Sequence, residues 1–515
     1  MIRHSSQTPE QNDWQEFRPL FGGGKIKLCD TLRAVTPFGG LSVLIEFLRR
    51  IELVEQLQER RPYQPKSPNH YEPGQILVSF MLSVIAGAQR FAHANQLRAD
   101  RALHALLGMS RFPSDDTILN YFRRFNQAKI EHFWRPLWRW LIGRLPAPVS
   151  GYSLDLDSTI FARHGTQQQG AARGYNPRRP GRLSHHPLLA VLAEANFVLH
   201  AWLRSGNSGA GQGAEQFLSE ALQLLGNAYR VRCVRADSGF YADNFLSFLE
   251  ARALPYIVVA RLTPYLKSRL YQISQWQAVD GIYSVSEFGF KLWNWKRERR
   301  FVVVREVVQS KKPAVGRKLI ELPGYVFRVF VTNRGDSALE IWRDYNGRAA
   351  VECRIDELKN ELAADHFCLR SFFATESAFL AVLFSFNLLS EFQRAIDPTL
   401  KTYKQPATLR FEVFTCGAIL GRSGHHLVLH MSKNWAATRN ENRCSTASYA
   451  GLHQLLRSLI RPRKMPHEFG QFRSPISGFG LNTQDRPQNS GKRQYFLPYP
   501  PLFAAGRFVE HRARC

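Results

Sequence analysis

Three acidic residues occupy positions from which a folded chain can bring their carboxylates together. Asp157 lies in the alternating stretch GYSLDLDSTIF, Asp237 follows the predicted strand RVRCVRA, and Glu352 lies on a predicted helix. Strand ends are where sites form in open α/β sheets. Mg²⁺ prefers hard oxygen ligands and keeps several waters, so two or three carboxylates are enough to bind it. The chemistry that such a set serves is metal-assisted cleavage of phosphodiesters.

The first acid has two candidates on the same predicted strand. Asp155 and Asp157 are two residues apart, so their side chains project from the same face of it. An aspartate at a strand end is also an ordinary turn or helix-cap residue. Together, the three acids indicate a functional site, because they come from three separate elements of a strongly basic chain.

The helix predicted over residues 345–359 carries four polar side chains on one stripe. These residues are Tyr345, Arg348, Glu352 and Lys359. Their spacing places them within an arc of roughly 60°. Arg348 and Glu352 alone are an i,i+4 pair of a kind common on exposed helices. Beside a catalytic carboxylate, the phenol, the guanidinium and the amine would instead bind the phosphates next to the cut.

Length and charge narrow the class of protein. The chain has 515 residues, of which 44% are hydrophobic, and a net charge of +27. This composition indicates a globular protein of several domains with a polyanionic partner, most often nucleic acid. A glycosidase built on a carboxylate pair would not explain the charge. Seven cysteines without a C-x-x-C spacing favour neither a disulfide framework nor a zinc site.

The pattern along the chain predicts a mixed α/β protein with a helical first part. Residues 149–261 read as strands and helices in the order β-β-β-α-β-α-β. The other predicted segments are a loose N-terminus (1–16), a helical domain (17–148), a β-rich insertion (262–322), a strand with two helices (323–396), and a C-terminal region with a basic tail (397–515). The stretches RFEVFTCGAIL and HHLVLHMS read as strands. The longest apolar runs, residues 76–88 and 378–389, are too short to span a bilayer, so we expect a cytoplasmic, nucleoid-associated protein.

Three motifs together resemble a known family. The spacing of Tyr345, Arg348, Glu352 and Lys359 resembles the Y-R-E-K signature of DDE-type insertion-sequence transposases. The stretch from DLDST to LLAVLAE is similar to the first-acid region of the insertion sequence 1380 family, and ADSGFY is similar to its second-acid motif. The resemblance extends over roughly residues 75–460.

The resemblance implies a fold and a set of catalytic residues. The fold is an α/β, RNase H-like mixed-sheet core, interrupted by the β-rich insertion and preceded by an α-helical domain that binds DNA ends. The catalytic and metal-binding acids are Asp157, Asp237 and Glu352, with Asp155 as the alternative first acid. The family pattern places the first acid directly before Ser or Thr, which favours Asp157. The cofactor is Mg²⁺, with Mn²⁺ as a possible substitute.

The implied partner is double-stranded DNA, as terminal inverted repeats and as target, bound by a homodimer in a synaptic complex. Tyr345, Arg348 and Lys359 are the implied DNA contacts on the helix. A related nuclease that cuts without joining would need the same acids, so sequence does not separate the two activities. A transposase-derived protein that binds DNA without catalysis is a further alternative.

A basic loop follows the first acid directly. HGTQQQGAARGYNPRRPGR carries Arg173, Arg178, Arg179 and Arg182 among glycines and prolines. Its position in the chain predicts that it lies over the DNA near the cut. A basic loop seen alone would more often be plain solvated surface.

Two tryptophans lie in the predicted insertion, within KLWNWKRERR. In relatives that form hairpins, a tryptophan of the insertion stacks on a flipped base, which makes Trp293 and Trp295 candidates for DNA binding. Alternatively, both rings pack in a small core of the insertion.

Overall fold

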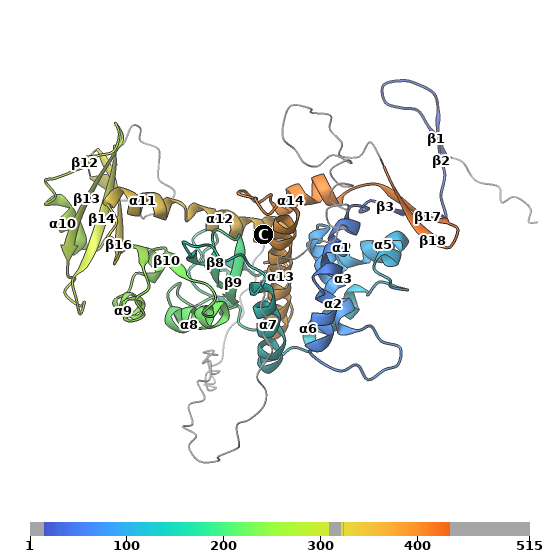
Figure 1. Ribbon diagram of the computed structural model, residues 1–515, viewed down its shortest axis with the longest axis horizontal. Helices are drawn as coiled ribbons and strands as arrows, with labels where there is room; N and C mark the ends of the chain where they lie inside the picture. Colours follow the sequence, from blue (N-terminus) through green and yellow to red (C-terminus); the bar gives the residue numbers. More distant parts are fainter. Residues whose placement is uncertain (1–14, 308–320, 323, 433–515) are drawn as a thin grey trace, which may run out of the picture.

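The computed structural model describes residues 15–307, 321–322 and 324–432. The predicted basic tail and nearly all of the predicted loose N-terminus lie outside the described residues. Figure 1 shows the large sheet at one end of the molecule, the N-terminal helices at the other, and the long helix α13 between them.

A ten-stranded mixed sheet organises the molecule, in the order β12-β13-β14-β16-β11-β10-β4-β8-β9, with β15 (Glu321–Leu322) paired to β16 off this path. Strand β9 (Phe197–Trp202) forms one edge of the sheet, and its middle strands include β8 (Leu188–Leu192), β4 (Tyr152–Ser158), β10 (Val231–Ala236) and β11 (Tyr256–Val259). Strands β8 and β9 continue antiparallel from β4, whereas β10 and β11 run parallel to it. Helix α8 (Ala214–Leu225) precedes β10 and α9 (Asp243–Ala251) precedes β11, so the predicted order β-β-β-α-β-α-β is confirmed.

Both β8 and β9 are buried along their whole length, which is why they read as nearly unbroken apolar runs. The outer edge of β9 is closed by side chains from the helices. Asn387 accepts a hydrogen bond from the Val198 amide at 2.7 Å and donates one to the Val198 carbonyl at 2.9 Å. Trp138 donates a further bond to this carbonyl at 2.9 Å. The closed edge cannot pair with another strand.

The predicted β-rich insertion extends the central sheet. Its elements are α10 (Pro264–Tyr271), β12 (Gln277–Ala278), β13 (Tyr283–Phe290) and β14 (Arg299–Val307). Strand β16 (Tyr325–Thr332) pairs antiparallel with β14 on one side and with β11 on the other. The insertion strands and the middle strands are therefore one sheet, and their buried side chains belong largely to one hydrophobic cluster.

The helix predicted to carry the Y-R-E-K stripe is divided, so the prediction of one continuous stripe is wrong in detail. The chain forms α11 (Ala338–Asn346), α12 (Ala349–Asp356) and a π-helical turn, η3 (Glu357–Glu361). Between α11 and α12, the Arg348 amide bonds the Tyr345 carbonyl three residues back, at 2.9 Å. Gly347 at this junction has a low helix propensity, and each change of helix type shifts the phase of the residues after it.

Helices build the first part of the described chain: α1 (Leu41–Arg50), α2 (Leu53–Glu59), α3 (Pro73–Ile85), η1 (Phe91–His93), α4 (Ala94–Arg98), α5 (Arg101–Leu106), α6 (Asp115–Arg123) and α7 (Gln127–Ile142). Of these, α3, α6 and α7 pack directly against α13 (Phe372–Ile396). Among the described residues, α13 is the one helix long and apolar enough to cross a membrane, and it is longer than the predicted apolar run. Because 89% of its apolar window is buried inside the protein, α13 is a core helix.

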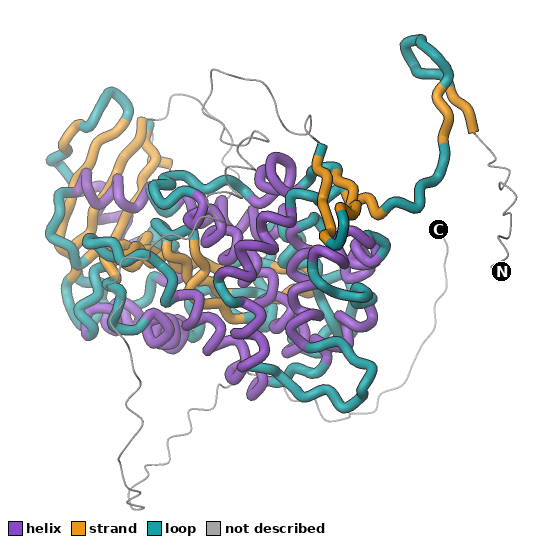
Figure 2. Tube along the Cα trace, turned by 45° about the vertical axis from the view of Figure 1, so that its right-hand side comes forward, coloured by secondary structure: helices purple, strands orange, loops and turns teal. Residues whose placement is uncertain are grey.

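The two ends of the described chain meet in a small sheet. Strand β3 (Ala34–Thr36) pairs with β17 (Ala418–Ser423), which pairs with β18 (His426–Met431). The ribbon β1 (Gln15–Phe17) and β2 (Ile26–Leu28) stands away from the body (Figure 2). The prediction of a strand over RFEVF is wrong: after α14 (Pro406–Leu409), these residues form the π-helical turn η4 (Arg410–Phe414).

Candidate active site

Two of the predicted acids lie side by side at one edge of the sheet. Strands β4 and β10 are parallel neighbours, and their register pairs Leu156 with Ala236. Asp157 is the next residue of β4, and Asp237 directly follows the last residue of β10. Asp157 accepts a hydrogen bond from the Ser158 amide at 2.7 Å. Asp237 caps the short 3₁₀ helix η2 (Ser238–Phe240) and accepts a bond from the Gly239 amide at 2.8 Å.

Arg348 joins the first and third predicted acids. Its Nη2 lies 3.2 Å from Oδ2 of Asp157, and its Nη1 lies 3.5 Å from Oε1 of Glu352. The guanidinium also donates to the Leu156 carbonyl at 3.2 Å. Arg348 is only 4% exposed, so its predicted role in binding phosphates is not what this structure shows. It orients two carboxylates, while the Glu352 side chain is 70% exposed.

The electrostatics of this edge favour a cation. Burial raises the pKa of Asp157 to about 6; Arg348 opposes this shift and the neighbouring Asp237 adds to it. A bound divalent ion would neutralise negative charge that is concentrated at a poorly hydrated position. Carboxylate oxygens are the hard ligands that Mg²⁺ prefers. Among the described residues, no three acidic, histidine or cysteine side chains converge closely enough to hold a metal ion.

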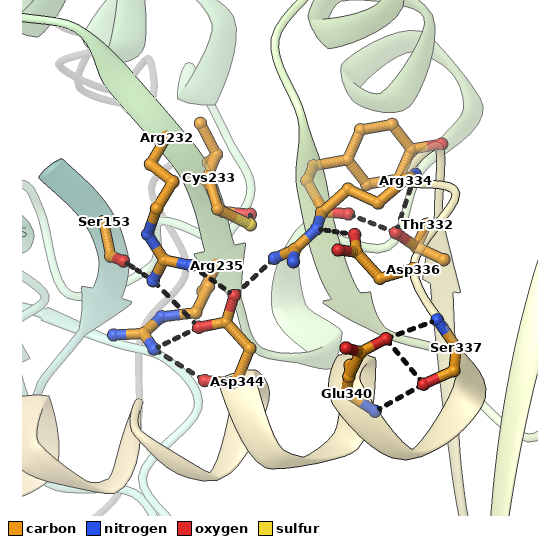
Figure 3. Close-up of polar contacts among 12 residues, drawn as sticks. Ser153, Arg232, Cys233, Arg235, Thr332, Arg334, Asp336, Ser337, Glu340 and Asp344 are labelled. Carbon is orange, nitrogen blue, oxygen red and sulfur yellow. Dashed lines mark hydrogen bonds and ion pairs between the residues drawn. The ribbon is translucent and has the colours of Figure 1, made fainter. Parts of the chain in front are cut away.

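Asp155, the alternative first acid, lies in a different environment from Asp157. It is fully buried and forms two bonds with Arg235, at 2.6 and 2.8 Å. Arg235 also reaches Asp344 on α11, at 3.2 Å, and Figure 3 shows Asp344 facing Arg232 and Arg334 as well. This ion-pair network fixes α11 against the sheet. Asp155 therefore holds structure in place, and its carboxylate does not reach solvent.

A groove of about 1090 Å³ opens beside the acids. Of the predicted site residues, Asp237, Lys359, Arg178 and Arg179 line it. Lys359 is half-buried and donates to the Ile160 carbonyl at 3.3 Å. Lining residues that were not predicted include Ser158, Tyr175, Asn176, His186 and Arg261. Their position along the chain could have indicated some of these residues, since Ser158 follows the first acid and Tyr175 and Asn176 belong to the basic loop.

The basic loop is partly built into a small sheet of β5 (Phe161–Ala162), β7 (Leu183–His185) and β6 (Ala172–Arg173), which the sequence did not predict. Arg178 and Arg179 are exposed along the groove. Arg182 is half-buried and donates to the Arg163 carbonyl at 3.2 Å, and the exposed Arg173 lies outside the groove lining. The loop thus brings two of its four predicted arginines to the groove.

Tyr345, on α11, is half-buried and packs on Phe330, with ring centroids 4.7 Å apart.

The two candidate tryptophans differ in burial. Trp295 is 5% exposed and packs between Tyr241 and Phe301, with ring centroids 5.3 and 5.8 Å away. Its prediction as a DNA-binding residue is wrong in this structure, because the ring belongs to the core. Trp293 is 80% exposed, so its ring is available to a partner.

Replacing Trp295 by Ala is expected to lower the free energy of unfolding by about 3–5 kcal/mol, because a large buried ring is lost. The matched control, Trp293→Ala, is expected to change it by less than about 0.5 kcal/mol. Urea denaturation followed by circular dichroism measures both values. Equal stability of the two variants would contradict the burial of Trp295.

The family model of the transposase DDE domain, group 1, matches residues 20–447, so the chain belongs to this family. A solved synaptic complex of piggyBac transposase with hairpin DNA is similar to it, with a TM-score of 0.40 and 12% sequence identity over 85% of this chain and 89% of the other. No curated protein matches the chain.

Proposed function

We propose that this protein is a transposase of the insertion sequence 1380 family, which binds the terminal inverted repeats of its element, cleaves the DNA ends and joins them to target DNA. Membership in the DDE domain family implies this kind of activity. The observation that carries the proposal is the placement of the three acids: Asp157 and Asp237 lie at the carboxyl ends of adjacent parallel strands, and Arg348 contacts both Asp157 and Glu352.

We further infer an RNase H-like catalytic core. The strand order β9-β8-β4-β10-β11 supports it, with three antiparallel strands followed by two that run parallel to β4. The first two acids then stand at the carboxyl ends of the two central strands, where a ligand meets an open sheet. We assign the first acid to Asp157, because Asp155 is enclosed by its ion pair with Arg235.

Each residue of the site has a part in the proposed reaction. Asp157, Asp237 and Glu352 would hold two Mg²⁺ or Mn²⁺ ions, which supply activation of the attacking oxygen and stabilisation of the leaving oxygen. Arg178 and Arg179 lie along the groove and neutralise phosphates of the bound strand. The first cut frees a 3′-hydroxyl, and this hydroxyl attacks the target phosphodiester. Cutting two ends together implies a homodimer.

Incubation of the purified protein with linear DNA that carries the repeats flanking its gene tests the proposal. With Mg²⁺ or Mn²⁺, nicks are expected at the repeat boundary, and a second DNA is expected to become joined to the freed end. Nicks without joined product would favour the nuclease. Tight repeat binding without metal-dependent nicks would favour the DNA-binding protein without catalysis.

The double substitution of Arg178 and Arg179 by Ala is expected to weaken binding equally for all DNA sequences, because phosphate contacts carry no sequence information. Each lost contact reduces the slope of log K against log salt concentration by about 0.9, so the pair should reduce it by about 1.8. Fluorescence anisotropy over a salt series measures the slope.

The matched control replaces Arg139 and Arg252, which line a separate hollow on the protein. This variant loses the same charge and is expected to keep the slope of the unaltered protein. An equal change in both variants would show that Arg178 and Arg179 act through overall charge and make no contact of their own.

A further inference from the structure

His186 lines the groove beside Asp237, and it is buried, with 5% of its surface exposed. Its Nδ1 is 2.6 Å from the carbonyl oxygen of Ser208, and its Nε2 is 3.1 Å from Oγ of Ser158. A carbonyl oxygen only accepts, so Nδ1 carries the proton and donates it. Burial lowers the pKa of His186, which disfavours the charged form of the ring. Its Nε2 therefore accepts from the Ser158 hydroxyl; this tautomer is assigned from the partners.

The two partners of His186 belong to the segments that carry the first two acids. Ser158 follows Asp157, and its amide donates to the Asp157 carboxylate. Ser208 belongs to a loop that packs tightly against the turn after Asp237. A Cβ atom added at Gly239 would lie 2.5 Å from Cβ of Ala210 in this loop, closer than such atoms approach. His186 thus ties the segment of the first acid to the loop that supports the second.

Arg204 holds this loop in shape from behind. It is 6% exposed and donates to the carbonyls of His186 at 3.0 Å, Gly209 at 3.1 Å and Gln212 at 2.8 Å. Within the described part of the chain, it forms no ion pair. A buried guanidinium is costly unless hydrogen bonds compensate it, so the carbonyls must stay in place around it. The loop beside His186 is therefore a rigid support.

We propose that His186 is a positioning residue, which sets the Asp157 carboxylate relative to Asp237 by holding Ser158 against the rigid loop. This inference rests on the proposed metal-dependent function. Partners that orient metal ligands from outside typically change metal affinity or activity 10- to 100-fold when they are lost. His186 touches no reacting atom, so its effect must pass through Ser158.

Two substitutions remove the same link from opposite sides. His186→Asn keeps an amide near Nδ1 for Ser208 and loses the acceptor for Ser158, whereas Ser158→Ala removes the hydroxyl. The readout is Mn²⁺ affinity in the presence of repeat DNA, measured from free Mn²⁺ by electron paramagnetic resonance, together with the Mg²⁺ concentration for half-maximal nicking. His132→Asn, an exposed histidine on α7, is the matched control.

We expect His186→Asn and Ser158→Ala each to weaken Mn²⁺ binding about 10- to 100-fold, and their combination to weaken it no further, because both break one link. Affinity for duplex DNA and the thermal midpoint should match the control. An Mn²⁺ affinity equal to that of His132→Asn, or effects that multiply in the double variant, would overturn the proposal. If His186→Asn lowers the thermal midpoint, the Mn²⁺ affinity of the less disruptive Ser158→Ala variant alone tests the proposal.

The Mn²⁺ measurement keeps the two proposals apart. Absence of nicking with normal Mn²⁺ binding would defeat the proposed transposase activity and leave the role of His186 to be read from the affinities. Absence of Mn²⁺ binding by the unaltered protein would overturn both.

Discussion

Asp237→Asn is expected to lower the rate of metal-dependent nicking by a factor on the order of 10⁴, the scale seen when one member of a catalytic unit is removed. Asn preserves the shape of the side chain and its bond from the Gly239 amide, but it removes the charge that would hold a divalent ion. Repeat DNA should bind as tightly or more tightly, because one negative charge near a polyanion is lost. Gel analysis of end-labelled repeat DNA measures nicking, and anisotropy measures binding.

Asp157→Asn and Glu352→Gln are expected to match Asp237→Asn, because the three acids would act as one unit. Asp116→Asn, in the first turn of α6, is the control that changes an exposed aspartate outside the groove. Nicking by Asp237→Asn within about tenfold of the control would rule out the assigned acid set, since such a loss is far smaller than loss of a metal ligand produces.

Asp344→Ala is expected to lower the free energy of unfolding by about 3–5 kcal/mol, the cost of breaking a buried ion pair from one side. The Asp344 side chain is 12% exposed. Arg232 donates to it at 2.8 and 3.0 Å, Arg235 contacts it at 3.2 Å, and Arg334 pairs with it as well (Figure 3). Its loss leaves three guanidiniums facing a space without their acceptor. Urea denaturation measures the change.

Asp336→Asn supplies the control for this network. Among the described residues, Asp336 forms its ion pair with Arg334 only, and its side chain is 40% exposed, so its loss should cost less than about 1 kcal/mol. Burial acts to raise the pKa of Asp344, but hydrogen bonds from Arg232 and Arg334 outweigh it and hold this pKa below its ordinary value. The contribution of Asp344 is therefore complete above about pH 4 and is lost as the pH falls through the lowered value. Equal stability of the two variants at neutral pH would contradict the network.

Loss of Asp344 should also change the placement of residues in the active site. Asp344 lies one helical turn before Arg348, and its ion pairs fix α11 against β10. Arg348 at the start of α12 then meets Asp157 and Glu352. Stability and the placement of the third acid are therefore coupled through one helix.

The order of the central elements and the positions of the candidate acids were accessible from the sequence alone. Alternation marked β4, an apolar run marked β8, and amphipathic spacing marked α8, because each depends on residues that are neighbours in the chain. Asp237 was recognisable as a strand end followed by a turn. The basic charge indicated a polyanionic partner, and the motif spacing indicated a DDE-type transposase. The match over residues 20–447 shows the DDE domain family.

Tertiary structure alone decided what each of these residues meets. Asp155 and Asp157 share one strand face, so periodicity treats them alike; Arg235, on a neighbouring strand, encloses only the first. Trp293 and Trp295 lie two residues apart in the turn between β13 and β14, yet only Trp295 packs into the core. The insertion strands joined the central sheet through β16, a pairing between distant segments that leaves no local period in the sequence. The burial of Arg348 between two carboxylates likewise depends on contacts with residues about two hundred positions away, which no local pattern records.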